Sequence, residues 1–106
     1  MLDILCTVIF FLGTCAGDAE CAEFLIQQDI LDLLLKVFNN RGDRPIDIDI
    51  KNHVLYFFYK LSAHKKTRDY MVENTRIPQL LLDLLHDSSR TVKDICEGAL
   101  ELIGVS

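Results

Sequence analysis

Four cysteines and three histidines are the side chains in this sequence best suited to catalysis or metal binding. A thiol beside an imidazole base is a common nucleophile, so Cys15 or Cys96 with His64 or His86 is the first pairing to consider. Both cysteines lie at apolar positions of helical patterns, and apolar burial raises a thiol pKa instead of lowering it. We therefore interpret the cysteines as structural and expect all four to be reduced. They are Cys6, Cys15, Cys21 and Cys96.

Other combinations of side chains give equally weak evidence for catalysis or metal binding. The cysteines and histidines lack the paired short spacings of zinc ligands, and no glycine-rich phosphate loop is present. His64 with Asp69 could be a base and the group that orients it. The H-x-x-T-R-D pattern favours a turn instead, in which Thr67 caps a short helix and Arg68 and Asp69 join that helix to a neighbour. We predict no catalytic residue, metal site or cofactor, and hence no enzyme.

The charge and the opening segment narrow the function classes. A net charge of −5 argues against nucleic-acid binding, which needs a basic surface. The opening "MLDILCTVIFFLGTCAGDAE" resembles an export signal, but it carries Asp3 and has no base before Lys36. Its uncharged stretch, 4–17, is shorter than the about 20 residues that span a membrane. We predict a buried helix, no membrane insertion, and a chance tripeptide at "RGD" (41–43).

Apolar residues recur at helical spacing almost throughout the chain. Expected helices span 2–16, 19–27, 30–38, 50–63, 67–73, 78–85 and 90–103. Capping side chains and breakers set these limits. They are Asp18, Asp29, Asp49, Thr67 and either Ser88 or Ser89 as caps, Pro78 in a first turn, and Gly42 and Pro45 in the loop "NNRGDRPIDID".

The order long, short, medium occurs twice before a last long helix. "ILDLLLKVFNN" (30–40) and "IPQLLLDLLHD" (77–87) align at an offset of 47 residues, and the long helices align at offsets of 49 and 41. Periods of about 40–47 residues with two or three helices indicate armadillo or HEAT repeats. We predict an all-α, armadillo-type α-solenoid, a right-handed superhelix of about two to two-and-a-half repeats. Its units are a partial repeat (1–16) and repeats at 18–63 and 67–105. Neighbouring armadillo repeats of the same full-length chain would cover its apolar ends.

The stretch "FFYKLSAHKKTRDYMVENTRIPQLLLDLLHDSSRTVKDICEGALELI" (57–103) resembles the C-terminal armadillo region of the kinesin-associated protein family. The resemblance rests on Phe58-Tyr59, His64, Thr67-Arg68-Asp69, Pro78, Leu81, Asp83-Leu84, His86-Asp87, Cys96, Leu100 and Ile103. The upstream "VIFFLGTCAGDAECAEFLI" is similar to the preceding repeat of that family.

This resemblance implies a non-catalytic adaptor that binds kinesin motor tails and links them to cargo proteins, in the cytoplasm and often at cilia. It implies no contact residue. The alternatives are an armadillo or HEAT peptide-binding scaffold unrelated to kinesin, and the regulatory domain of an enzyme. A nuclear-import receptor is a further rival, but the chain has no Trp and Asn52 is its only candidate groove asparagine.

The second long helix suggests which face binds a partner. A step of 100° per residue places Val54, Phe57, Phe58 and Leu61 on one side and Asn52, His53, Tyr56, Tyr59 and Lys60 on the other. The offsets carry this second stripe onto Asp3, Thr7 and Phe10, and onto Lys93, Glu97, Leu100 and Glu101. Concave solenoid surfaces bind extended ligands, and exposed aromatic residues are frequent anchors.

We therefore predict a groove for a partner peptide or helix that includes Asn52, Tyr56, Tyr59 and Lys60. Acidic Glu97 and Glu101 would favour basic residues at one end of that ligand. In the alternative, Tyr56 and Tyr59 only pack against neighbouring repeats.

Overall fold

The computed structural model describes residues 2–39, 48–87 and 89–104, with side chains from residue 8 onward apart from 37–49. These residues form seven α-helices and one 3-10 helix, with no strand among them. The elements are α1 (Leu2–Cys15), α2 (Ala19–Ile26), α3 (Ile30–Asn39), α4 (Ile48–Ser62), α5 (Lys65–Asn74), α6 (Ile77–Asp83), η1 (Leu84–His86) and α7 (Arg90–Ile103). Residues 40–47 of the predicted loop, the RGD tripeptide and the cap at Ser88 lie outside the described residues, and the ends of that predicted loop belong to α3 and α4.

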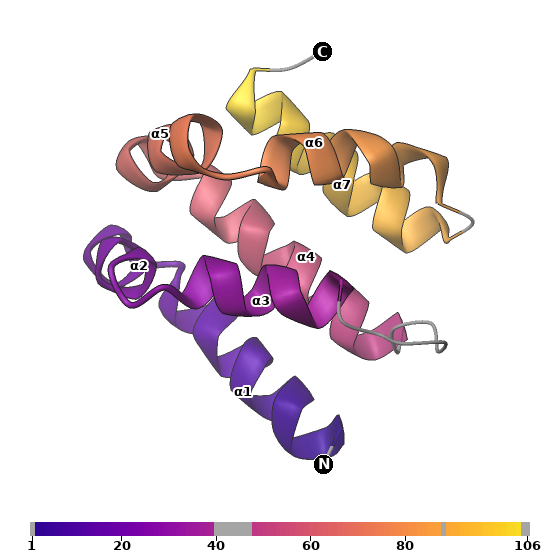
Figure 1. The fold of residues 1–106 in the computed structure, drawn as a ribbon, viewed down its shortest axis with the longest axis horizontal. Coiled ribbons are helices and arrows are strands. Elements are labelled where there is room, and N and C mark those ends of the chain that lie inside the picture. Colours follow the sequence, from indigo (N-terminus) through magenta and orange to yellow (C-terminus); the bar gives the residue numbers. More distant parts are fainter. Residues whose placement is uncertain (1, 40–47, 88, 105–106) are drawn as a thin grey trace.

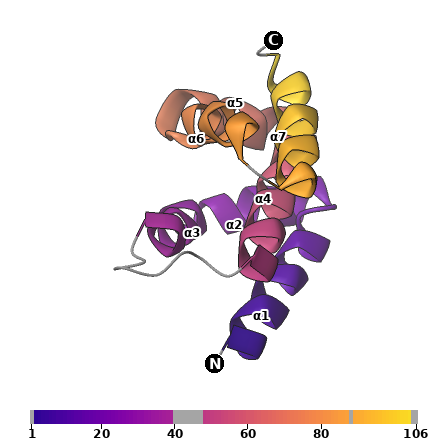
Figure 2. The ribbon, with the colours of Figure 1, turned by 90° about the vertical axis from the view of Figure 1, so that its right-hand side faces the viewer.

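The helices form two layers (Figures 1 and 2). The long helices α1, α4 and α7 lie side by side in one layer and run in the same direction, and α4 packs against both others. The other layer holds α2, α3, α5 and α6. Helix α4 is therefore the centre of the molecule, and both outer long helices depend on it for burial.

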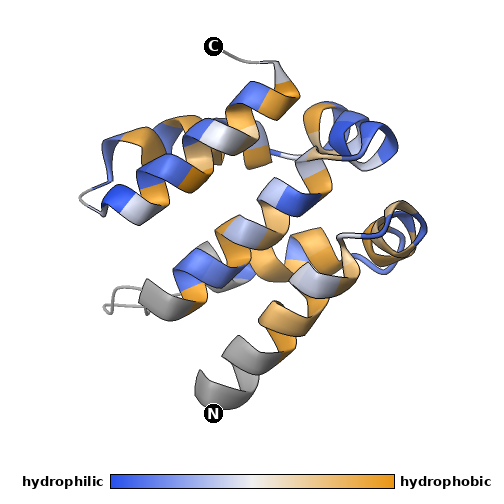
Figure 3. Ribbon diagram, turned by 180° about the vertical axis from the view of Figure 1, so that it is seen from behind, coloured by the Kyte–Doolittle hydropathy of each residue, from blue (hydrophilic) through white to orange (hydrophobic). Residues whose placement is uncertain are grey.

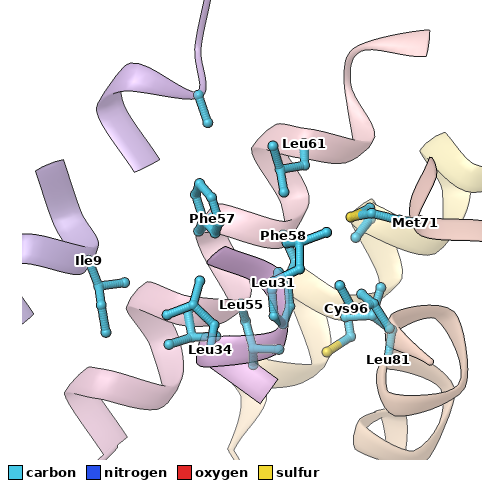
Figure 4. Packing of buried hydrophobic residues seen from close by; sticks show 14 of the residues in the cluster. Ile9, Leu31, Leu34, Leu55, Phe57, Phe58, Leu61, Met71, Leu81 and Cys96 are labelled. Carbon is cyan, nitrogen blue, oxygen red and sulfur yellow. The ribbon is translucent and has the colours of Figure 1, made fainter. Parts of the chain in front are cut away.

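The core lies between the layers and along α4 (Figure 4). The predicted inner stripe of α4 is confirmed, because Val54, Phe57, Phe58 and Leu61 are all fully buried. Leu34 of α3 and Leu81 of α6 are also buried. Each large apolar side chain buried in this way stabilises the fold by about 1.5–3 kcal/mol. Apolar residues of the long helices also appear in the view from behind (Figure 3).

Several predicted helix ends are confirmed. Asp18 is extended, with a side-chain oxygen that accepts a hydrogen bond from the Cys21 amide at 3.3 Å. Ser89 caps α7 in the same way through the Val92 amide at 3.4 Å. Pro78 lies in the first turn of α6, where its missing N–H has no helical partner to lose. Gly104 ends α7 with a φ of 93°, a conformation that favours glycine.

Three predicted caps are wrong. Asp49 lies inside α4, which begins at Ile48. Asp29 has a φ of 58°, unlike the extended backbone of an N-cap. Thr67 lies inside α5, where His64 holds the N-cap position without a side-chain bond. The sixth helix also ends early, at Asp83, and continues as the 3-10 turn η1.

The H-x-x-T-R-D stretch closes the carboxyl end of α4. The buried Thr67 hydroxyl donates to the Leu61 carbonyl at 2.6 Å, and Arg68 Nη1 donates to the Ser62 carbonyl at 3.2 Å. Carbonyls at a helix end lack their usual helical donors. The Leu61 carbonyl also accepts a bond from the His64 amide at 3.3 Å, and the two side chains supply further donors. The prediction that Asp69 joins α5 to a neighbouring helix is wrong, because its carboxylate pairs with Lys65 at 2.9 Å within α5.

Two polar contacts join α4 to its neighbours. His64 Nε2 donates to the Ala16 carbonyl at 2.8 Å, just beyond the end of α1. Lys51 Nζ donates at 2.5 Å to Oδ1 of Asp87, which lies in the turn before α7. The Asp87 carboxylate also accepts a bond from the Ser89 amide at 2.9 Å. The hydrogen bond from Lys51, followed by that from Ser89, lowers the pKa of Asp87 although partial burial opposes the shift.

Candidate partner-binding surface

Two tyrosines form the centre of the predicted surface on α4. The rings of Tyr56 and Tyr59 stack at a centroid distance of 6.1 Å, with 7° between their planes. Lys60 Nζ lies 5.1 Å from the Tyr56 ring centroid, within the range of a cation–π contact. Tyr56 is 42% exposed, whereas Tyr59 and Lys60 are half-buried. The three side chains thus brace one another and keep one aromatic ring open to solvent.

Aromatic residues extend this surface onto α1. The ring of Phe10, which is 58% exposed, meets the His53 ring edge-on at 5.8 Å. We call Phe10, His53, Tyr56 and Tyr59, together with Lys60, the aromatic stripe. It crosses the α1–α4 contact in the layer of long helices. The offset of 49 residues placed Phe10 on this face, and its exposure agrees.

Two helical glycines lie against the tyrosines, and one of them, Gly98, gives Tyr59 its space. A Cβ atom on Gly98 of α7 would lie 2.9 Å from Cε2 of Tyr59, closer than real contacts of this kind. A Cβ atom on Gly13 of α1 would lie 3.9 Å from Cδ2 of Tyr56, an ordinary contact. Neither glycine was identified from the sequence. A glycine inside a helical pattern costs stability and commonly has a packing reason, which is the signal that could have found them.

Asn52 precedes Tyr56 on α4 by about one turn. Asn52 as a whole is half-buried. Its side-chain oxygen, Oδ1, is buried and has no hydrogen-bond partner among the described residues. An unsatisfied buried oxygen of this kind costs about 1–3 kcal/mol. The carboxamide is thus the one buried polar side chain in the described part that lacks its bond, and it lies on the predicted face.

On α7, Glu97 and Glu101 are exposed as expected, but Leu100 is only 4% exposed. The predicted placement of Leu100 on the open stripe is therefore wrong. The fully buried residues of α7 include Val92, Cys96 and Ala99, so Leu100 belongs to the buried side of the helix and not to its open stripe.

The cysteine–histidine pairs do not form a reactive site in the described residues. Cys96 is buried, and burial raises its pKa to about 12. Burial also raises the pKa of Cys21, with a smaller effect from a hydrogen bond to Cys15. The three described cysteines are free thiols, and Cys6 lies outside the described side chains. The His64 ring is engaged with Ala16.

The described residues also contain no group of three or more side chains placed to hold a metal ion. Within the same residues, no helix is both long enough and apolar enough to cross a membrane.

A stack of helices with its long members in one layer is compatible with an α-solenoid, a class that works through extended surfaces. Comparison with protein families makes the assignment specific. The model of the family described as kinesin-associated protein (KAP) matches residues 1–106, the whole chain, and the chain belongs to this family. Membership indicates an adaptor role in association with kinesin. No solved structure gives a significant match.

Proposed function

We propose that this chain is a non-catalytic adaptor module that joins kinesin motor tails to cargo proteins. Its repeats would be of the armadillo type, with a partial unit at 1–16, units at 18–63 and 67–105, and a right-handed superhelical path. The family match over the whole chain supports the kinesin association. The order of long, short and medium helices supports the repeat assignment. The module would act in the cytoplasm, including at cilia.

Further repeats of the full-length chain would complete the stack. Phe11 of α1 and Phe24 of α2 are 66% and 54% exposed, an unusual state for two large aromatic side chains. We propose that a neighbouring repeat packs against them. Their burial would then belong to the architecture and not to partner binding.

The partner-binding surface would be the aromatic stripe. The observation that carries this proposal is the stacked, partly exposed pair of Tyr56 and Tyr59 on the layer of long helices. Aromatic anchors that are already fixed lose little side-chain entropy when a partner binds. Glu97 and Glu101 are exposed on the adjacent α7, so a partner helix or peptide with basic residues at one end matches this surface.

Asn52 would contribute a hydrogen bond to the bound partner. Its Oδ1 has no partner among the described residues, so a rotation of the carboxamide toward the groove sacrifices no existing bond of that oxygen. A backbone N–H of an extended partner could then donate to it. Satisfying a previously unpaired buried oxygen would favour the bound state.

The test is capture of purified kinesin tails by the intact protein carrying Tyr56→Ala and Lys60→Glu. Loss of an anchor residue should weaken capture by at least about tenfold. The matched control is Tyr70→Ala with Lys66→Glu on α5, because Tyr70 is similarly exposed at 37%. The control should bind as the wild type does.

The outcomes separate the two parts of the proposal. If the wild type captures no kinesin tail, the adaptor role itself is contradicted. If the stripe variant melts and binds as the wild type does, the tyrosines serve only to pack neighbouring helices, and the groove assignment is wrong. If stripe and control variants weaken capture equally, the effect reflects net charge and not this surface.

A further inference from the structure

A cleft of about 630 Å³ lies in the layer opposite the aromatic stripe, between α3 and the segment formed by α5, α6 and their turn. The cleft thus lies between α3 and α6, the medium helices of two successive proposed repeats. Two half-buried leucines, Leu35 of α3 and Leu80 of α6, form the apolar part of its lining. The volume is within the about 300–1,000 Å³ of typical ligand sites.

Three carboxylates also belong to this lining. Asp32 of α3, Glu73 of α5 and Asp83 of α6 are all exposed, and Arg76 is the one cation among the described residues of the lining. Asp83 Oδ1 accepts a bond from the Gln79 amide at 3.1 Å, which leaves its second oxygen available within the same carboxylate. The cleft therefore combines an apolar surface with a net negative rim.

Some polar groups of the lining are already used by the fold. The Thr75 hydroxyl donates to the Met71 carbonyl at 2.6 Å and accepts a bond from the Ile77 amide at 3.2 Å. These bonds fix the turn between α5 and α6. Glu73 and Arg76 flank Thr75 in the sequence, so the same bonds fix the backbone that carries these two lining residues.

We infer that this cleft binds a short basic segment of a partner protein, with arginine or lysine side chains lying across it. Such side chains carry an apolar stem and a charged head. The stems would cover Leu35 and Leu80, and the heads would reach the carboxylates of Asp32, Glu73 and Asp83. Charge-assisted hydrogen bonds of this type are stronger than neutral ones.

This site goes beyond the adaptor groove, because it lies in the other layer of helices (Figure 2). A ligand in the cleft and a partner on the aromatic stripe would not compete for the same residues. The chain could therefore hold two partners at the same time, one on each layer. Neither assignment requires the other to be correct.

A synthetic probe tests the cleft without any kinesin component. The probe is a fluorescein-labelled hexapeptide that alternates arginine and leucine, titrated with the intact protein by fluorescence anisotropy. The cleft variant carries Asp32→Asn, Glu73→Gln and Asp83→Asn. Because three exposed ion pairs are removed together, its affinity should fall by at least about tenfold. A peptide with glutamine in place of arginine should bind neither protein measurably.

The matched control carries the same change of charge at acids outside the lining and outside the aromatic stripe, namely Glu20→Gln and Glu23→Gln on α2 and Asp94→Asn on α7. It should bind the probe within about twofold of the wild type, because exposed charges beyond the Debye length of about 8–10 Å are largely screened. Equal weakening by both triple variants, stronger weakening by the control, or no binding by the wild type would each overturn the inference.

A gain-of-binding variant guards against misfolding of the triple variant. Arg76→Glu removes the one cation of the lining and should tighten probe binding by at least about threefold. Arg90→Glu at the start of α7, whose side chain is 91% exposed, is its control and should leave affinity within about twofold. Equal tightening by both variants would also overturn the cleft assignment.

Discussion

Gly98 offers the sharpest test of how α4 and α7 meet. An alanine at an interior helical position in place of glycine normally adds about 0.8–1 kcal/mol of stability. At Gly98 the new Cβ would lie 2.9 Å from Cε2 and 3.4 Å from Cδ2 of Tyr59. The Tyr59 ring is stacked on Tyr56, so it cannot move away without disturbing that pair.

The magnitude follows from two opposing contributions. Overpacking of a filled contact, including the disturbance of the Tyr56–Tyr59 pair, costs about 1–3 kcal/mol. Set against the helix gain of about 1 kcal/mol, Gly98→Ala should change stability by between about zero and a loss of 2 kcal/mol. In a Tyr59→Ala background the obstruction is absent, and the same substitution should stabilise by about 1 kcal/mol.

Urea titrations followed by far-ultraviolet circular dichroism would measure this double-mutant cycle. The expected coupling between positions 98 and 59 is about 1–3 kcal/mol. Gly13→Ala is the control, because its new Cβ would meet Tyr56 at an ordinary 3.9 Å and should gain about 0.5–1 kcal/mol. If Gly98→Ala stabilises the wild type as much as Gly13→Ala does, the close approach of Tyr59 is refuted.

Three further predictions concern the core, acid stability and thiol reactivity. Leu34→Ala and Leu81→Ala should each cost about 2–5 kcal/mol in urea titrations, because both side chains are buried; unchanged midpoints would contradict their place in the core. The pKa of Asp87 is lowered by Lys51, so this pair stabilises the fold fully above the unfolded pKa of about 3.9 and loses its effect as pH falls through the folded pKa. The stability difference between wild type and Asp87→Asn should therefore shrink in acid, and a constant difference would exclude this linkage. Cys96, with a pKa of about 12, should resist iodoacetamide at neutral pH until urea unfolds the chain, as mass spectrometry of digested samples would reveal.

The helix order could be predicted because burial repeats with the period of the helix. Leu34 and Leu81, matched at an offset of 47 residues in the sequence, are both buried. Asp18 was identifiable as a cap, and Ser89 as one of two candidates, because their side chains bond to amides within three residues. A local interaction of this kind leaves its pattern in a short stretch of sequence.

The wrong or missed predictions concern contacts that no short sequence pattern reveals. Thr67 has the residue type of an N-cap, yet its hydroxyl bonds backward to Leu61, six positions earlier. That choice depends on how α5 folds back on the end of α4. The same limit applies to Leu100, whose burial depends on the relative register of α4 and α7. The packing of Tyr59 against Gly98 likewise requires knowledge of which helices meet.

The two polar ties of α4 have a mechanical consequence. His64 attaches the carboxyl end of α4 to the end of α1, whereas Lys51 attaches its amino end to the turn before α7. The two contacts lie at opposite ends of α4. Tension along the stack would therefore separate α1 from α4 at the amino end of α4, and α7 from α4 at its carboxyl end. We expect amide exchange near Tyr59 to quicken when Lys51→Met removes one tie; unchanged exchange there would argue for uniform stiffness. Stretching the stack would therefore load one polar contact at each end of α4.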